Sequence, residues 1–389
     1  MPFCGEVRNQ VTDDREGTTI FYRTYGKGNT KVLLIIGLAG THDSWGPQIK
    51  GLTGSDSPNA DDLAFGEIDD DVGAGIHVCA FDNRGMGRSS IPTKKSEYTT
   101  EIMAMDAVSV MNHLKWKKAH VVGHSMGAMV AWKVAALAPE RILSLALLNV
   151  TGGGFECLPR LDRKTISIAY RFLRAKTAEE RAAVDLDTHY TEVNISKQEQ
   201  IPSVYPLLQE YLNQTVGLKT RRAVLYQEYV KAIKSSGMQS PHGFDGQINA
   251  CWTHAITRRD METIRASGCL VSVIHGRDDV IAQINHARRL ASKLHPSARM
   301  VDLHGGHLVS HERPDEVNNA LLDLVRAAEA GVKAADWTNV SVKGGYYGGG
   351  GGLLRSLLLL VCSVFAVMVE YFRRTHGGLK PVRVGSALT

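Results

Sequence analysis

The stretch Ala119–Val130, AHVVGHSMGAMV, decides how the rest of the chain is interpreted. A short β-branched run leads into Gly123-His124-Ser125-Met126-Gly127, and an apolar segment typical of a helix follows. A strand that turns sharply into a helix at Gly-x-Ser-x-Gly is the pattern of a nucleophile elbow, where the two glycines leave room for a strained serine. The pattern predicts that Ser125 is a nucleophile, with helix N-terminal amides aimed at negative charge on a substrate oxygen.

The composition is that of an ordinary globular protein. Of its 389 residues, 43% are hydrophobic, which is enough to build a large core. The net charge of +5 arises from 45 basic and 40 acidic residues that are interspersed, whereas nucleic-acid binding needs basic residues clustered on one element. We therefore expect no nucleic-acid partner. Because no metal, nucleotide or flavin motif is present, we expect no metal or cofactor.

The six cysteines predict a reducing compartment. They are scattered without a Cys-x-x-Cys pair, and Cys79, Cys269 and Cys362 lie in apolar runs, as buried thiols do. The N-terminus has neither the basic nor the apolar region of a secretory signal. We therefore expect a protein that faces the cytosol.

Apolar runs typical of buried strands recur along the chain and alternate with helical segments. The predicted strands cover residues 31–36, 76–81, 118–123, 142–148, 269–274 and 299–303, and residues 18–22 are expected in a pair of edge strands. Helices are predicted at 101–115, from the elbow to about residue 138, and at 314–330. This alternation implies βαβ units, and hence an α/β protein with a mostly parallel central sheet flanked by helices.

Interruptions of this alternation divide the chain into units. The predicted units are a first core part at 1–151, a helical cap at 152–265, a second core part at 266–335, a Gly-rich linker at 336–352 and a hydrophobic C-terminal tail at 353–389. The glycines at 348–352 lack the strand and helix that flank a phosphate-binding loop, so they predict a flexible linker.

The C-terminal tail carries a long apolar segment. The 20 residues 353–372 contain only two charged side chains, Arg355 and Glu370, near the ends. About 20 apolar residues span a bilayer, and an arginine near one end can reach the interface. The segment predicts an anchor in a cytosol-facing membrane. The alternative is a soluble cytoplasmic protein in which the segment is an amphipathic, dimerising or buried helix.

A serine hydroxyl is a good nucleophile only when a base takes its proton, so the elbow requires an acid and a histidine further along the chain. The acid is expected after the strand at 269–274, where Gly276 precedes Asp278 and Asp279. The third position after the glycine points towards the histidine, which favours Asp279. We expect Asp278 to stabilise the turn instead.

The base is expected after the last strand, where the chain reads His304-Gly305-Gly306-His307. His307 follows two glycines and precedes a predicted helix, so it is the favoured base. His304 and His311 are the alternatives.

Two backbone N–H groups must meet the oxyanion that forms when the serine attacks a carbonyl. One belongs to the residue after the nucleophile, Met126. The other is expected from the turn Gly37-Leu38-Ala39-Gly40, after the strand at 31–36, and we assign it to Leu38.

Together these motifs resemble the α/β-hydrolases of the capped, esterase- and lipase-like kind. The matching pieces follow the family's order and are Gly37–Gly40, Asp82–Ser89, Gly123–Gly127, Gly276–Asp279 and Gly306-His307. They imply the α/β-hydrolase fold over about residues 18 to 330, with 152–265 as its cap and the tail outside the resemblance. The resemblance implies Ser125 as nucleophile, Asp279 as acid and His307 as base. The family often has His-Gly where this chain has Ile36-Gly37.

Three functions are open at this stage. The favoured one is a serine hydrolase that cleaves an ester, including a lipid-derived ester, through an acyl-enzyme intermediate. The second keeps the same three residues but hydrolyses a C–C bond, as in a diketone. The third is a small-molecule receptor of the same fold with slow or no turnover.

Overall fold

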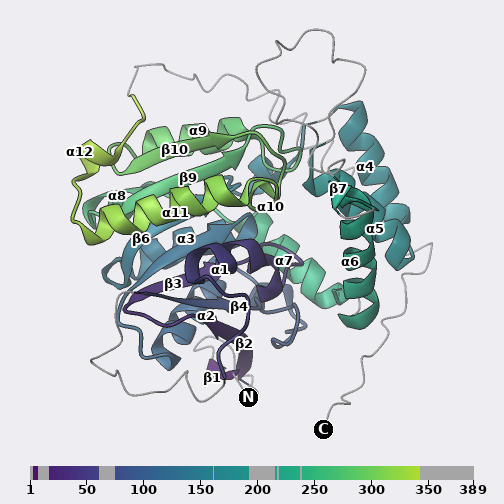
Figure 1. Cartoon of the computed structure of the whole chain (residues 1–389), viewed down its shortest axis with the longest axis horizontal. Coiled ribbons are helices and arrows are strands. Elements are labelled where there is room, and N and C mark those ends of the chain that lie inside the picture. Colours follow the sequence, from purple (N-terminus) through teal and green to yellow (C-terminus); the bar gives the residue numbers. More distant parts are fainter. Residues whose placement is uncertain are drawn as a thin grey trace.

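The computed structural model describes residues 3–7, 17–60, 75–160, 162–191, 215–216, 219–236 and 239–341 (Figure 1). The predicted anchor at 353–372 and most of the predicted linker lie outside these residues. No helix within the described ranges is both long enough and apolar enough to cross a membrane.

A sheet of eight strands, in the order β1-β2-β4-β3-β5-β6-β9-β10, forms the centre of the molecule (Figure 1). Its strands are β1 Phe3–Val7, β2 Thr18–Tyr25, β3 Thr30–Ile35, β4 Ile76–Phe81, β5 Ala119–His124, β6 Ile142–Leu148, β9 Leu270–Gly276 and β10 Ala298–Leu303. In this spatial order, the neighbouring strands β4, β3, β5, β6, β9 and β10 pair in parallel, whereas β1 pairs with β2, and β2 with β4, antiparallel. The prediction of a mostly parallel sheet is confirmed.

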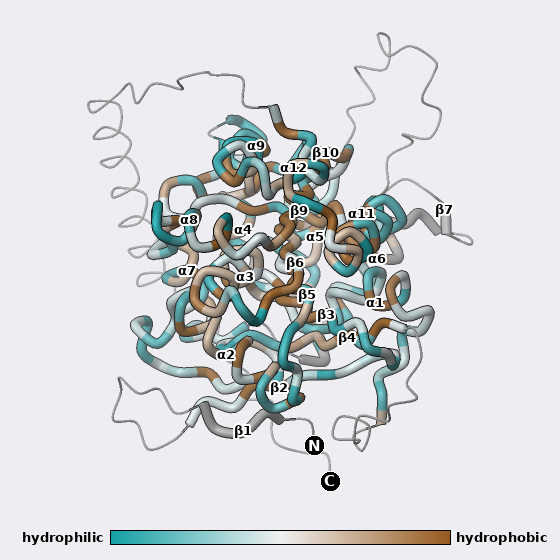
Figure 2. Tube along the Cα trace, turned by 90° about the vertical axis from the view of Figure 1, so that its left-hand side faces the viewer, coloured by the Kyte–Doolittle hydropathy of each residue, from teal (hydrophilic) through white to brown (hydrophobic). Residues whose placement is uncertain are grey.

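Helices cover both faces of this sheet. They are α1 Gly46–Thr53, α2 Thr100–His113, α3 Met126–Leu137, α8 Arg258–Ala266, α9 Ile284–Lys293, α10 Val309–Glu312, α11 Pro314–Glu329 and α12 Ala334–Trp337. In β3, Leu33 and Ile35 belong to the hydrophobic cluster that includes residues of α2, α3, α8 and α9, whereas Val32 and Leu34 belong to the cluster that includes residues of α1, α11 and α12. Because successive strand residues face opposite sides, a strand covered on both faces is apolar throughout. Figure 2 shows the hydrophobic residues concentrated in these central strands.

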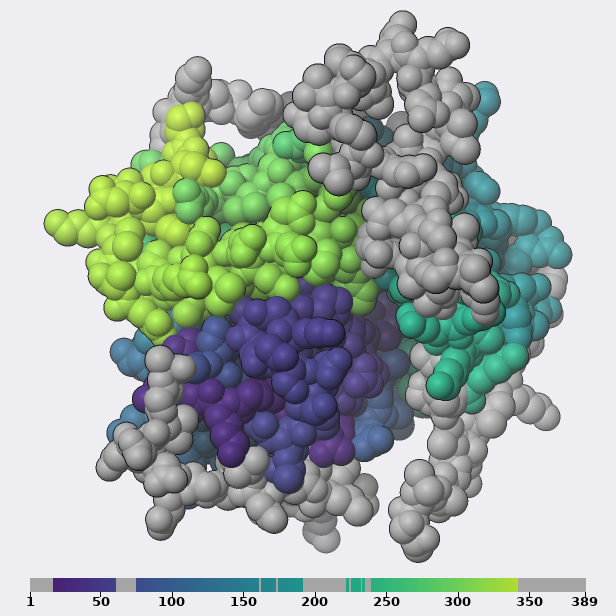
Figure 3. Space-filling model, in the orientation of Figure 1, coloured from purple at the N-terminus to yellow at the C-terminus, as the bar shows by residue number. Residues whose placement is uncertain are grey.

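The insertion between β6 and β9 begins with helices that stand beside the sheet. These are α4 Arg163–Arg174, α5 Ala178–His189 and α6 Arg221–Ser236, with a short antiparallel pair, β7 Thr215–Val216 and β8 Lys219–Thr220, before α6. In Figures 1 and 3 these helices form a group to one side of the core. The last two helices of the insertion, α7 Pro241–Thr253 and α8, return to the core and pack on α3. These helices fall within the predicted cap, 152–265, except that α8 continues to Ala266.

Two of the cysteines in apolar runs are buried, as predicted. Cys79 and Cys269 are buried and form no disulfide bond, and Cys362 lies outside the described residues.

Buried polar side chains fasten the end of α7 to the core. His254 is buried, and its Nδ1 lies 2.9 Å from Thr100 Oγ1 on α2. Nearby, Lys133 Nζ on α3 lies 2.9 Å from carboxylate oxygens of both Glu101 and Asp260. Burial, together with the positive charge of Lys133, lowers the pKa of His254 to about 4. His254 is therefore neutral in the folded protein at neutral pH.

We expect the free energy of unfolding of His254→Gln to fall less steeply than that of the wild type as the pH is lowered into mild acid. An unfolded histidine has a pKa of about 6.5, so below this pH the unfolded chain binds a proton that folded His254 does not bind until about pH 4. As the pH is lowered through that window, this histidine alone decreases the free energy of unfolding by up to about 1.4 kcal/mol per pH unit. Guanidinium unfolding over the window should therefore show a shallower pH slope for His254→Gln than for the wild type.

The exposed His242, on the same helix, offers the matched control His242→Gln. Equal slopes for the wild type and His254→Gln would show that His254 takes up its proton equally in both states.

Candidate active site

Ser125 occupies a sharp turn between β5 and α3. Its φ of 55° and ψ of −122° are a conformation that side chains rarely adopt. A Cβ on Gly123 would lie 2.3 Å from Gly127 O, and one on Gly127 would lie 2.1 Å from Ile35 O. Only glycines therefore fit at both positions of this turn. The Ser125 side chain does not cap α3, so its hydroxyl is left for another partner.

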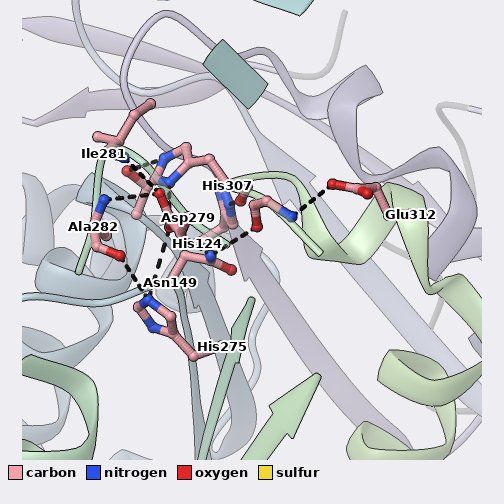
Figure 4. A network of polar contacts seen from close by, with 10 residues as sticks. His124, Asn149, His275, Asp279, Ile281, Ala282, His307 and Glu312 are labelled. Atoms are coloured by element: carbon pink, nitrogen blue, oxygen red, sulfur yellow. Dashed lines mark hydrogen bonds and ion pairs between the residues drawn. The ribbon is translucent and has the colours of Figure 1, made fainter. Parts of the chain in front are cut away.

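His307 is that partner, and it also contacts Asp279. His307 Nε2 lies 3.0 Å from Ser125 Oγ, and its Nδ1 lies 2.8 Å from Asp279 Oδ2. Asp279 follows β9, and His307 lies between β10 and α10. Because β5, β9 and β10 are parallel, their carboxyl ends meet at one edge of the sheet and bring the three residues together. Figure 4 shows His307 and Asp279 within this network.

The hydrogen bonds of Asp279 hold its carboxylate in place. Oδ1 accepts from the amides of Ile281 and Ala282, each at 2.8 Å, and Oδ2 accepts from Asn149 Nδ2 at 2.7 Å (Figure 4). Burial alone would raise the pKa of Asp279, but His307, His275 and Asn149 outweigh it and lower the pKa to about 2. The carboxylate only accepts hydrogen bonds, so His307 Nδ1 carries the proton between them. His307 Nε2 is then free to accept from the Ser125 hydroxyl.

The alternative acid and base residues lie apart from this chain of contacts. Asp278 is exposed, as is His304, whose Nε2 accepts from Arg277 Nη1 at 2.9 Å. His311 is less exposed than Asp278 and His304, and its Nε2 donates to Ser44 O at 2.7 Å. The structure therefore brings together Ser125, Asp279 and His307.

The turn at residues 37–40 lies against the Ser125 turn. A Cβ on Gly37 would come within 2.9 Å of Ser125 Cβ, so glycine permits this close approach. Within the described part of the chain, neither the Leu38 amide nor the Met126 amide donates a hydrogen bond. Met126 is the first residue of α3, where helix amides lack partners. Neither N–H group therefore has a hydrogen-bond acceptor among the described residues.

Two side chains that the sequence did not indicate hold this turn. Asn83 Nδ2 donates to Ile36 O at 2.7 Å, and the amide of Ala39, which has a φ of 59°, donates to Gln247 Oε1 at 3.0 Å. These two hydrogen bonds support the turn at residues 37–40, in a chain that has Ile36-Gly37 where the family often has His-Gly. Gln247 lies on α7, within the insertion, and no spacing in the sequence links it to the turn.

Asn149 is a further residue to which the sequence analysis gave no role. It follows β6 with a φ of 49°, a left-handed conformation that asparagine tolerates. Besides donating to Asp279, its Nδ2 lies 3.2 Å from Gly306 O, in the loop that carries His307. Its place directly after a predicted strand was a usable signal, because polar residues at such ends meet at one edge of the sheet.

We expect Asn149→Gly to lower kcat about 10-fold, with a smaller change in KM. Glycine tolerates the left-handed backbone but removes the hydrogen bonds to Asp279 and Gly306, which orient the acid and the base loop. Steady-state kinetics with an ester substrate, together with a melting curve, would measure this. An unchanged kcat in a folded variant would show that Asn149 does not orient the pair.

His124, the residue before Ser125, contacts His307. Its Nε2 donates to the backbone oxygen of His307 at 2.7 Å, and the two rings lie edge to face with centroids 5.0 Å apart. Burial, followed by the neighbouring His307, lowers the pKa of His124 to about 3. The His124 ring is therefore a neutral hydrogen-bond donor to the base loop.

No group of three or more His, Cys, Asp or Glu side chains suited to a metal ion is found among the described residues.

Comparison with known proteins defines the class of this protein. Residues 31–314 match the family model described as the alpha/beta hydrolase fold, which covers more than half of the chain. The chain therefore belongs to the α/β-hydrolase family, as the motifs predicted.

Two relatives match most of its length. The chain is 26% identical over 299 residues to the "Putative carbamate hydrolase RutD" of Caulobacter sp. (strain K31), covering 77% of this chain and 91% of the relative. It is 25% identical over 276 residues to epoxide hydrolase A of Mycobacterium tuberculosis (strain ATCC 25618 / H37Rv), covering 66% and 84%. The family and these relatives identify the chain as a hydrolase.

Solved structures share the fold. The enol-lactonase from Burkholderia xenovorans LB400 superposes with a TM-score of 0.56 at 22% identity, covering 79% of this chain and 97% of that chain.

Proposed function

We propose that this protein is a serine hydrolase that cleaves an ester through an acyl-enzyme intermediate. The observation that carries the proposal is the continuous hydrogen-bonded chain from Ser125 Oγ to His307 Nε2, at 3.0 Å, and from His307 Nδ1 to Asp279 Oδ2, at 2.8 Å. A serine, a base and an orienting acid in this geometry are what activation of a hydroxyl nucleophile requires.

The reaction follows from these contacts. Ser125 Oγ attacks the carbonyl carbon while its proton moves to His307 Nε2, and Asp279 stabilises the resulting imidazolium. The oxyanion accepts hydrogen bonds from the amides of Leu38 and Met126. Attack gives a tetrahedral intermediate that carries this oxyanion. When the intermediate collapses, the ester C–O bond breaks and the leaving alcohol takes the proton from His307. Water then gives a proton to His307 and attacks the acyl-enzyme, which releases the acid and restores Ser125.

A serine nucleophile favours acyl substrates over epoxides, although one relative is named an epoxide hydrolase. Attack of Ser125 on an epoxide would form an ether, which has no carbonyl for water to attack, so the enzyme would stay alkylated. An ester gives an acyl-enzyme that water can cleave. A carbamate, the substrate in the name of the other relative, also has a carbonyl carbon that a serine can attack.

The apolar segment at 353–372 supports a lipid-derived ester as the substrate class. An anchor in a cytosol-facing membrane would hold the active site beside substrates that partition into the bilayer.

Labelling with a fluorophosphonate tests the nucleophile. We expect the wild type and Ser292→Ala, which changes an exposed serine, to be labelled, and Ser125→Ala to remain unlabelled. Failure of the wild type to label, or equal labelling of Ser125→Ala, would contradict the proposal.

A substrate panel then tests the reaction. We expect p-nitrophenyl esters of increasing acyl length to be hydrolysed, and a lipid extract to yield the natural ester. Faster cleavage of a diketone than of any ester would instead make the protein a C–C hydrolase. Tight binding of a small ligand without turnover would make it a receptor.

A further inference from the structure

The segment that follows α5 contacts the loop that carries His307. The Leu308 amide, directly after His307, donates to the backbone oxygen of His189, the last residue of α5, at 3.0 Å. On the other side of His307, a Cβ on Gly306 would lie 2.7 Å from the same His189 oxygen. The backbone of His189 is therefore packed against both neighbours of the base.

A buried carboxylate makes a second link between this segment and the loop. Glu312 Oε1 accepts from the Gly306 amide at 2.7 Å and from the Thr191 amide at 3.2 Å. Its Oε2 accepts from Thr191 Oγ1 at 2.5 Å. Glu312 thereby ties the start of the base loop to the chain just beyond α5, and Figure 4 shows it next to this loop.

The side chain of His189 also lies against the base. The imidazole rings of His189 and His307 are stacked, with centroids 6.1 Å apart and planes inclined by 26°. Burial, followed by the neighbouring His307, lowers the pKa of His189 to about 3, so its ring is neutral and does not repel a protonated His307. His189 Nδ1 also lies 3.4 Å from Tyr229 Oη on α6, a second contact of this ring.

His307 thus contacts two histidines from different parts of the chain. His124 is the last residue of β5 and contacts the His307 ring edge to face, whereas His189 comes from the insertion and stacks on it. A base that must reach Ser125 Oγ and Asp279 Oδ2 together tolerates little rotation, since a displacement of about 1 Å can cost about 100-fold in rate.

We propose that His189 is a positioning residue that holds the His307 ring in line with Ser125 and Asp279. A residue of the insertion thereby helps to fix the position of the base. This inference rests on the proposed function, because it assigns to His307 the role of base. It does not give His189 any contact with the substrate.

Two substitutions of similar size separate stacking from simple packing. His189→Leu fills the space without a flat ring, and His189→Phe keeps a flat ring without nitrogen atoms. We expect His189→Leu to lower kcat for an ester about 10-fold with a smaller change in KM, and to slow fluorophosphonate labelling by a similar factor. His189→Phe should keep kcat within about 3-fold of the wild type.

A spectroscopic signal and a control complete the experiment. The downfield proton resonance of the His307 Nδ1–H···Asp279 hydrogen bond should shift or broaden in His189→Leu and persist in His189→Phe. Tyr170→Ala, which changes a side chain that is 57% exposed on α4, should leave kcat and this resonance unchanged. Melting curves would show that each variant is folded.

The outcomes are distinct. Wild-type kinetics and labelling for His189→Leu would overturn the positioning role, as would an equal loss in His189→Leu and His189→Phe. If the wild type itself does not react with the fluorophosphonate, the proposed function fails before the positioning role is tested.

Discussion

Ser125→Ala is expected to lower kcat for an ester by at least about 10⁴-fold while KM changes little. Without the Ser125 hydroxyl no acyl-enzyme forms, and only the amides of Leu38 and Met126 and the binding of substrate remain to favour direct attack by water. Substrate affinity is retained because alanine removes one atom from the turn and leaves its backbone unchanged.

A double variant makes this prediction sharper. If Ser125 and His307 act as one unit, Ser125→Ala/His307→Ala should be about as active as Ser125→Ala alone, since His307 no longer has a serine hydroxyl to activate. Ser292→Ala serves as the control, and all variants are compared by initial rates at matched protein concentration. A Ser125→Ala protein that retains a tenth or more of the wild-type kcat, by our rough threshold, would exclude Ser125 as the nucleophile.

Asp279→Asn is expected to lower kcat by about 10⁴-fold through the wrong tautomer of His307. The amides of Ile281 and Ala282 both donate to Asp279 Oδ1, so an asparagine must place its own oxygen there. Its amide nitrogen then faces His307 Nδ1, which becomes an acceptor, and the ring proton moves to Nε2. A protonated Nε2 cannot accept the proton of Ser125. The same amide nitrogen also meets the donor Asn149 Nδ2.

The neighbouring aspartate supplies a matched control. Asp278→Asn makes the same chemical change at the adjacent, exposed position and should keep kcat close to the wild type. Measuring kcat and the rate of fluorophosphonate labelling for both variants distinguishes the two aspartates. If kcat fell equally in Asp278→Asn and Asp279→Asn, the activity would depend on the turn as a whole and not on the carboxylate beside His307.

Much of the architecture was predictable from local pattern. The runs at 31–36, 76–81 and 142–148 are apolar throughout because both faces of those strands are covered by helices, and they became β3, β4 and β6 with bounds within two residues of those predicted. Ser125, Asp279 and His307 could be singled out because each follows a predicted strand. Their roles remain a proposal that the variants above test.

The sequence by itself determined the elements, the parallel sheet and the strand ends where chemistry is expected, because alternation of strands and helices and the turn residues are local properties. Only the tertiary structure decided what surrounds the base and the turn at 37–40. His189 is far from His307 along the chain, and Gln247 is far from Ala39, yet each pair is in contact. Such contacts depend on how the insertion folds back onto the core, and a single sequence has no periodicity that records them.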